Sequence, residues 1–213
     1  MERLVCLAIG YVFGLLQTGY LYGRAKGIDI RDHGSGNAGT TNALRTLGKK
    51  AGLITFLGDA FKCVFAVLLV WAIFHNSRAD IMPLLKLYTG AGVVLGHNYP
   101  FYLKFRGGKG IAATAGMLLS FDWIIVSCAL VTFLAAFVLT SYVSLGSLLV
   151  YAGFMIEVVV LGQMGYFNVA QPVLNEMYII VALLTILAFY KHRANIGRLL
   201  KGEENKTILF HKK

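Results

Sequence analysis

The sequence alternates between long apolar stretches and short polar loops. Seven apolar stretches stand out, over residues 4–22, 51–74, 84–103, 111–121, 123–139, 142–164 and 173–190. A helix crosses the roughly 30 Å core of a bilayer in about 20 residues. The pattern therefore predicts an all-α polytopic membrane protein with about seven spans. The stretch over 111–121 is too short to cross alone unless its helix starts within 107–110.

Composition supports a membrane protein built as one unit. Of the 213 residues, 57% are hydrophobic and only 14% are charged, which is more apolar surface than a soluble domain can bury. We expect a single integral membrane domain, with a helical core over residues 1–190 and a polar cytoplasmic tail over 191–213. The three cysteines share no metal-ligand spacing, so we expect no metal site and no other cofactor.

The positive charge is unevenly distributed. Of the 20 Lys and Arg residues, sixteen fall in the loop over 23–50, the turn over 104–109 and the tail, whereas the opposite loops carry three. Because cytoplasmic loops of membrane proteins are rich in Lys and Arg, this asymmetry predicts an outside N-terminus and a cytoplasmic C-terminus. A five-span chain with re-entrant segments satisfies the same count. Charge in such short loops indicates membrane orientation, and we expect no nucleic-acid partner.

Three cytoplasmic segments are more polar than topology requires. They cover residues 34–45, 97–110 and 192–198, and they read GSGNAGTTNALR, HNYPFYLKFRGGKG and HRANIGR. Glycines expose backbone N–H groups to an anion, basic side chains supply charge, and Ser, Thr and Asn supply neutral hydrogen bonds. Each segment alone is also compatible with an ordinary turn. Three of them on one membrane face favour a phosphate-binding site.

Other motifs in the chain carry less weight. Gly34, Gly36 and Gly39 match the spacing of a dinucleotide fingerprint, but a membrane span precedes them where a βαβ unit is required. The Gly-Gly-Lys-Gly turn over 107–110 lacks the remaining residues of a nucleotide phosphate loop. His75 and Asp80 have the spacing of the acyl-CoA-dependent acyltransferases, although charge counting places them outside, away from the basic loops.

Charged residues near the middle of a predicted span need an explanation, and Asp59, Lys62 and Glu157 are in such positions. Asp59 and Lys62 stand three residues apart and therefore share a helix face, which predicts a buried ion pair. Glu157 has no basic residue at helical spacing, and the sequence offers no explanation for it.

The three polar segments together resemble the bacterial acyl-phosphate-dependent glycerol-3-phosphate acyltransferase family. That family carries S-G-N-x-G-x-T-N-x-x-R, then G-G-K-G, then H-R-x-N-I-x-R, which correspond here to residues 35–45, 107–110 and 192–198. The resemblance extends over essentially the whole chain, including the spacing of the spans. It implies transfer of a fatty acyl group from acyl phosphate to the 1-hydroxyl of glycerol 3-phosphate, giving lysophosphatidic acid and inorganic phosphate.

The resemblance also implies the setting and the site. The enzyme would act at the cytoplasmic face of the bacterial cell membrane, in contact with membrane lipid. A soluble phosphate acyltransferase would supply the acyl phosphate and would contact this protein transiently. The implied catalytic residues are Ser35, Lys104, His192 and Asn195. The implied substrate-binding residues are Asn37, Thr41, Asn42, Arg45, His97, Gly107, Gly108, Lys109, Gly110 and Arg193.

By analogy with the family, we assign the donor phosphate to the turn over 107–110 with Lys109, and Lys104 is a second candidate. The glycerol phosphate is assigned to Ser35, Arg45, His192 and Asn195, with Asn37 as a further candidate. This division between the two substrates is a hypothesis.

None of the three motifs carries a carboxylate at its centre, so the usual general base is missing. Acyl phosphate is already activated, and a phosphate dianion with a pKa near 6 is able to accept the hydroxyl proton. His192 as the base and Ser35 as a covalent nucleophile are the competing interpretations. An anion transporter is the alternative function, although it would favour polar groups near the membrane midplane.

Overall fold

The computed structural model describes residues 1–207, and within them all regular structure is helical. Three short 3-10 turns cover Ile30–Asp32, Ala79–Ile81 and Phe101–Leu103. The longer helices are α1 Glu2–Gly14, α2 Thr18–Ala25, α3 Thr40–Leu47, α4 Lys49–Phe74, α5 Met82–Asn98, α6 Ile111–Phe121, α7 Trp123–Thr140, α8 Val143–Gln163, α9 Gln171–Lys191 and α10 Arg193–Leu200.

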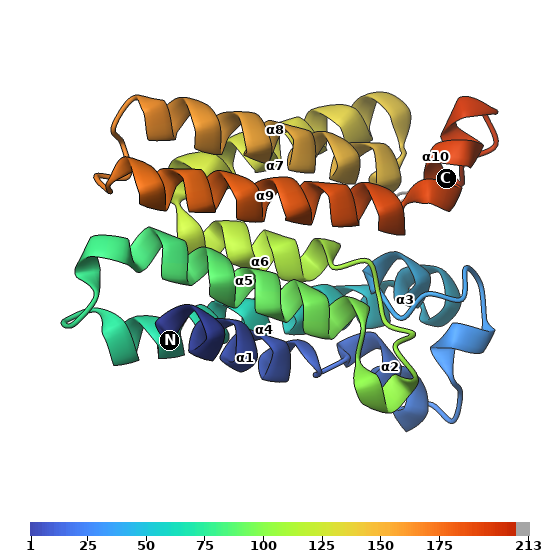
Figure 1. Ribbon diagram of the computed structural model, residues 1–213. Coiled ribbons are helices and arrows are strands. Elements are labelled where there is room, and N and C mark those ends of the chain that lie inside the picture. The colour runs from blue at the N-terminus through green and yellow to red at the C-terminus, as the bar shows by residue number, and fades with distance from the viewer. Residues whose placement is uncertain (208–213) are drawn as a thin grey trace.

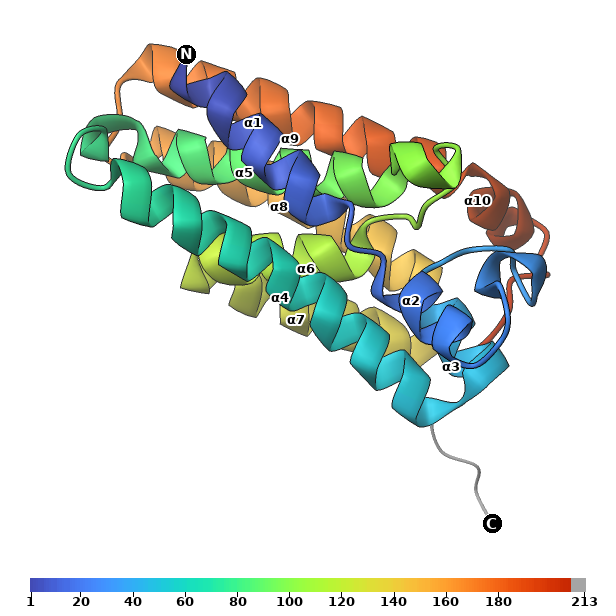
Figure 2. The ribbon, with the colours of Figure 1, turned by 90° about the horizontal axis from the view of Figure 1, so that it is seen from below.

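The helices pack lengthwise into one bundle (Figure 1). Five segments are long and apolar enough to cross a membrane, namely Glu2–Ala25, α4, α7, α8 and α9. Helices α5 and α6 also run along the bundle, so seven helical passes alternate in direction (Figures 1 and 2). The eleven residues of α6 rise only about 16 Å. Whether all seven passes cross the bilayer therefore stays a prediction.

Helix α5 lies at the centre of the core, and twelve of its seventeen residues are buried. It packs closely on α1 through glycines at four-residue spacing in both helices. A Cβ atom built on Gly10 would stand 2.1 Å from the carbonyl oxygen of Thr89, and one on Gly92 would stand 2.2 Å from that of Leu7. Only glycine allows the two backbones to approach this closely.

The first predicted span is not one continuous helix. It breaks between Gly14 and Thr18, where Gln17 interrupts the apolar stretch but no proline marks a break. Lys62 Nζ donates to the carbonyl oxygen of Leu16 at 2.5 Å, and Asp59 Oδ1 accepts from Thr18 Oγ1 at 3.1 Å. The cation thus lies at the C-terminal end of α1 and the carboxylate at the N-terminal end of α2, as the helix dipoles favour.

The predicted ion pair between these two residues is confirmed, with 2.9 Å between Lys62 Nζ and Asp59 Oδ1. Gln17 adds to the repair of the break, because its side-chain amide donates to the carbonyl oxygens of Gly14 and His97, each at 3.1 Å. Backbone groups left free inside a membrane are costly, so these side chains account for how the broken helix is tolerated.

The polar loops contain more helix than the sequence suggests. The loop expected over 23–50 includes α3, and the expected tail begins with α10. The third predicted span ends as a helix at Asn98, because the chain turns at Pro100 into a 3-10 segment. The rest of the tail is described as far as Thr207, and its last six residues lie outside the described residues.

Candidate active site

The three polar segments meet at one end of the bundle, where α2, α3, α10 and the turn before α6 gather (Figure 1). Two adjoining cavities of about 540 and 500 Å³ open there. The smaller one is enclosed by polar groups from the first and third segments. The larger one continues past them between apolar side chains. Both cavities are bordered by Ser35, Asn37, Arg45, Lys109, Asn195, Arg198 and Asn205.

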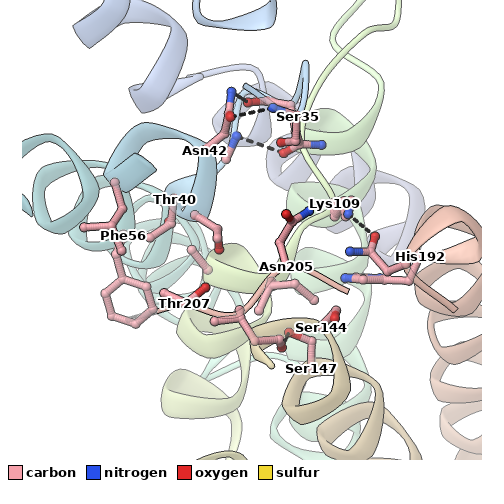
Figure 3. A pocket seen from close by; sticks show the side chains of 18 of the residues that line it. Ser35, Thr40, Asn42, Phe56, Lys109, Ser144, Ser147, His192, Asn205 and Thr207 are labelled. Carbon is pink, nitrogen blue, oxygen red and sulfur yellow. Dashed lines mark hydrogen bonds between the residues drawn. The ribbon is translucent and has the colours of Figure 1, made fainter. Parts of the chain in front are cut away.

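The first polar segment is held in shape by Asn42, whose side chain is buried (Figure 3). Its Oδ1 accepts from the backbone N–H of Ser35 at 2.9 Å, and its amide donates to the carbonyl oxygens of Ile30, His33 and Asn37 at 2.9–3.0 Å. Gly34 lies against it at φ +59°, a conformation that favours glycine. Asn42 therefore orders the loop, and the Ser35 hydroxyl remains available at the cavity.

Arg45 projects from α3 beside both cavities. Among residues 1–207, no carboxylate or carbonyl group pairs with its guanidinium. It stands where two cavities meet, and its planar fork matches the geometry of a phosphate group. Thr41, one helical turn earlier on α3, also borders the larger cavity.

The glycine turn of the second segment lies partly behind the cavity wall. A Cβ atom on Gly107 would stand 2.0 Å from the carbonyl oxygen of His97, and one on Gly108 would stand 2.0 Å from His97 Nε2. These two glycines therefore allow the turn to pack on His97. Gly110 follows at φ +84° and starts α6, whose first residues border the larger cavity. The N-terminal end of a helix favours an anion there.

The third segment forms a connected polar network with Lys109. Lys109 Nζ donates to Asn195 Oδ1, and Asn195 Nδ2 donates to Glu204 Oε1 at 2.6 Å. The same carboxylate accepts from Arg198 Nε at 2.7 Å and from Ser144 Oγ at 3.0 Å. Glu204 thus brings a carboxylate to a site whose motifs contain none, because the chain folds back after α10.

Three side chains at this part of the site have shifted pKa values. Burial is the main cause that lowers the pKa of Lys109 to about 8; Glu204 opposes the shift, and Arg198, Lys191 and Arg45 add to it. Burial, followed by the nearby Lys109 charge, lowers the pKa of His192 to about 4. For Glu204, burial raises the pKa, but the hydrogen bonds from Asn195, Arg198 and Ser144 outweigh it and leave the pKa lowered. A carboxylate that already accepts three hydrogen bonds and has a lowered pKa is a poor proton acceptor.

The neutral His192 ring has a defined tautomer. Its Nδ1 lies 2.8 Å from the carbonyl oxygen of Ala188, which can only accept, so Nδ1 carries the proton. Nε2 is therefore bare. The imidazole presents a hydrogen-bond acceptor, and at neutral pH it carries no charge.

The larger cavity extends into an apolar groove. Phe56 of α4 and Thr207 of the folded-back tail border it in Figure 3, together with Ser144 and Ser147 at the start of α8. Beyond them the lining is hydrocarbon, from Leu44, Phe133, Leu134, Phe137, Val138 and Val143. Helix α7, which supplies four of these, is largely exposed on its outer face, as a lipid-facing helix would be.

Most of the residues expected from the sequence are brought together. The cavities are bordered by Ser35, Asn37, Thr41, Asn42, Arg45, His97, Lys109, Gly110, His192 and Asn195. Gly107 and Gly108 pack against His97 and border neither cavity. Lys104 is exposed in the turn outside both cavities, and Arg193 points to the Tyr190 ring, 4.4 Å from its centroid.

Other residues at the cavities were not expected. Arg198 belongs to the third motif, and its place there was a signal for it. Glu204 is the second of two adjacent Glu residues after Gly202 in a basic tail, which was a signal for an acidic group near the site. Ser144 and Ser147 also border the larger cavity, and their signal in the sequence was a pair of hydroxyl residues one helical turn apart in an apolar stretch. His75 and Asp80 lie between α4 and α5, at the opposite end of the bundle (Figure 1). The His75 ring stacks on Trp71. No group of three or more potential metal ligands is present among residues 1–207.

Comparisons with known proteins place this arrangement in a family. The family profile described as glycerol-3-phosphate acyltransferase matches residues 4–202. The glycerol-3-phosphate acyltransferase of Clostridioides difficile (strain 630) is 44% identical and covers 95% of this chain and 94% of its own. That of Bacillus subtilis (strain 168) is 38% identical, covering 94% of this chain and 95% of its own.

A solved structure is similar along the whole chain. The integral membrane glycerol 3-phosphate acyltransferase PlsY (YgiH), in its glycerol 3-phosphate form, superposes with a TM-score of 0.81 at 30% identity, covering 98% of this chain and 96% of its own. Its lysophosphatidic acid form gives a TM-score of 0.79 at 29% identity with the same coverage. With these matches over nearly full length, the chain belongs to the glycerol-3-phosphate acyltransferase family of integral membrane proteins.

Proposed function

We propose that this protein transfers a fatty acyl group from acyl phosphate to the 1-hydroxyl of glycerol 3-phosphate, with lysophosphatidic acid and inorganic phosphate as products. The observation that carries the proposal is the pair of adjoining cavities with a shared basic wall. One cavity is polar and suits a small phosphate ester. The other joins a cationic end to an apolar groove and suits a lipid with an anionic head.

In this proposal, the donor phosphate lies at the N-terminal end of α6, next to Lys109, and the acyl chain follows the groove along α7. Glycerol 3-phosphate occupies the smaller cavity between Ser35, Arg45 and Asn195. The two reacting groups meet at the shared wall, where Lys109 and Arg45 stabilise the charge that develops on the leaving phosphate. Lys104 and Arg193 lie too far out to be central to this arrangement.

We further propose that the acceptor's own phosphate takes the hydroxyl proton. The lowered pKa values of His192 and Glu204 support this, because each makes the side chain a weak base at neutral pH. His192 Nε2 is suited to orient glycerol 3-phosphate by accepting a hydrogen bond from its 2-hydroxyl, which leaves the proton of the 1-hydroxyl free to move to the phosphate. The His192→Gln variant should then lose at most about two orders of magnitude in rate, against about four for loss of a true base.

The donor is tested directly with purified protein in detergent. Acyl phosphate and glycerol 3-phosphate should yield lysophosphatidic acid and inorganic phosphate in equal amounts, with little product from acyl-CoA. Comparable rates with both donors would overturn the donor assignment. Mass spectrometry after mixing with acyl phosphate alone should show unmodified protein, and an acyl group on Ser35 would instead establish a covalent intermediate.

We also propose the membrane arrangement expected from charge, with seven spans and the site facing the cytoplasm of a bacterial cell. Ser77 and Lys206 lie near opposite ends of the bundle. Single cysteines at these positions, in an otherwise cysteine-free protein, should label from opposite sides in intact cells. In this orientation the site faces the compartment of the soluble enzyme that supplies acyl phosphate, and that enzyme is the proposed transient partner.

A further inference from the structure

Asp59, Lys62 and His97 form a buried network beside the larger cavity. They expose 0%, 3% and 2% of their surface, respectively. Lys62 Nζ lies 2.5 Å from the carbonyl oxygen of Leu16, 2.9 Å from Asp59 Oδ1 and 2.9 Å from His97 Nδ1. The carbonyl oxygen of Gly14 is farther away, at 3.3 Å. The three protons of an ammonium group match the three close contacts.

This geometry assigns the proton on His97. A lysine ammonium is a donor only, so Nδ1 of His97 accepts from Lys62 and carries no proton. The ring cannot be doubly protonated without losing this bond and setting two cations beside one carboxylate. His97 is therefore a neutral imidazole with its proton on Nε2. His192 has the reverse tautomer, because its Nδ1 donates to Ala188.

The Nε2 atom of His97 faces the glycine turn. A Cβ atom on Gly108 would lie only 2.0 Å from it, and His97 borders the larger cavity. Among residues 1–207, no protein group accepts a hydrogen bond from Nε2. The need to support the broken first span accounts for the contacts of Lys62 with Leu16 and of Asp59 with Thr18. It does not account for the bond between Lys62 and His97.

We propose that Lys62, held by Asp59, is a positioning residue that keeps His97 in its Nε2–H tautomer, and that His97 donates this hydrogen bond to the phosphate of the donor substrate. The site would then contain two neutral imidazoles with opposite roles. His97 gives a hydrogen bond to phosphate, and His192 accepts one from the 2-hydroxyl of glycerol 3-phosphate. The phosphate's identity as that of acyl phosphate rests on the proposed function; the tautomer does not.

The first test is ¹⁵N NMR of histidine-labelled protein in detergent micelles, with the His97 signals assigned by their loss in His97→Gln. Protonated and bare imidazole nitrogens resonate far apart, so the tautomer is read directly. Nδ1 should be bare and Nε2 protonated in the wild type. In Asp59→Asn/Lys62→Met, which removes both charges together and leaves no buried charge unpaired, the ring should populate both tautomers.

Thr18→Val is the matched control for the helix break. It removes a hydroxyl contact to Asp59 but leaves the Lys62 bond to His97 in place. The tautomer should be unchanged, and the activity should stay within about twofold of the wild type. A proton on Nδ1 of His97 in the wild type, or an unchanged tautomer in the double variant, would overturn the proposal.

The second test uses two amide substitutions of His97 and remains decisive if the double variant does not fold. A glutamine amide reaches the position of Nε2, whereas an asparagine amide reaches only that of Nδ1. His97→Gln should keep kcat/KM for acyl phosphate within about tenfold, and His97→Asn should lose about a hundredfold, as expected when a bond to a charged group is lost. Equal losses in the two variants would refute the Nε2 donor.

The two proposals fail in different ways. If wild-type protein prefers another acyl donor, the proposed function fails, and the NMR result still decides the tautomer of His97. If acyl phosphate is the donor but His97→Gln and His97→Asn behave alike, only the inference about His97 fails.

Discussion

At one end of the bundle, Arg3 of α1 holds Glu176 of α9 through hydrogen bonds of 2.6 and 2.8 Å, and Tyr88 of α5 donates to the same carboxylate at 2.6 Å. At the other end, Arg45 borders two cavities and has no carboxylate partner among the described residues. The first arginine fixes three helices to one another. The second leaves its charge available to a ligand.

The same contrast extends to the neighbouring charges. Arg78 pairs with Glu2 at 2.8 Å at the Arg3 end, so this cation is neutralised locally as well. At the site end, the one carboxylate in the network, Glu204, forms an ion pair with Arg198, whereas Lys109 and Arg45 contact no carboxylate among the described residues. A surplus of cations held in fixed positions is what an enzyme with two anionic substrates requires. Basic residues are therefore informative about function only when their partners are known.

The strongest test of this contrast is to remove each arginine in turn. Arg45→Ala should lower kcat/KM about 10²- to 10³-fold, the usual loss when a donor to a charged reacting group is removed. Arg45→Lys should recover part of it, because the charge remains but the fork is lost. Arg3→Met should leave kcat/KM within about twofold and lower the melting temperature instead. Equal kinetic losses at both ends would abolish the distinction.

The next largest effect is expected at the glycine turn. In Gly108→Ala, the new methyl group would overlap His97 Nε2, so the turn or the ring must move. Displacement of a binding group by about 1 Å costs on the order of a hundredfold in rate. The KM for acyl phosphate should rise more than that for glycerol 3-phosphate. Gly197→Ala in α10, where no atom lies within 4 Å of the added Cβ, is the control and should be nearly silent.

Equal effects of Gly108→Ala on both substrates would show that the two phosphate-binding sites are divided differently between the substrates. Normal kinetics would show that the turn only connects α5 to α6, and that His97 does not contact a substrate.

The convergence of the three polar segments could be predicted from sequence, because charge and alternating spans put all of them at the same membrane face. The pairing of Asp59 with Lys62 could also be predicted, since helical spacing alone brings them together. The structural role of this ion pair, which is to support the break in the first span, could not be predicted. The break between Gly14 and Thr18 is marked in the sequence only by Gln17 and contains no proline, and its stabilisation by Lys62 depends on how α1 packs against α4.

The residues that line the groove, and Glu204, could not be identified from the sequence for a related reason. Phe133 and Phe137 of α7 form part of the cavity, but in the sequence they look like any lipid-facing residues. Glu204 reaches the site only because the chain turns at Gly202, at φ +71°, and runs back toward α8. Local patterns reveal chemistry within a motif; they do not reveal which distant segment completes it.

A smaller effect is expected from this returning segment. Glu204→Gln keeps the shape of the side chain but cannot accept from Asn195, Arg198 and Ser144 as a carboxylate does. The network with Lys109 should loosen, and kcat/KM should fall about ten- to thirtyfold, in line with the loss of one or two such bonds. Glu203→Gln alters the exposed neighbouring residue and should have no effect. If both variants match the wild type, the tail merely lies against the site.

The smallest effect at neutral pH, and the one that depends most on the protonation of the site, concerns Lys109. Its pKa of about 8 means that the ammonium form prevails below pH 8 and is lost as the pH rises through that value. Because only the charged form attracts phosphate, kcat/KM for acyl phosphate should decline above pH 8, by about tenfold at one unit beyond the pKa. The decline in kcat alone should start at higher pH, since bound phosphate favours the ammonium.

In Lys109→Arg the side chain stays protonated, so this alkaline decline should disappear from the measured range even if the overall rate is reduced. The acidic limb should stay near the second pKa of the acceptor phosphate, about 6, and not follow His192 at about 4. An alkaline decline that persists unchanged in Lys109→Arg would mean that another group titrates, and that the free cation at the site end is not Lys109.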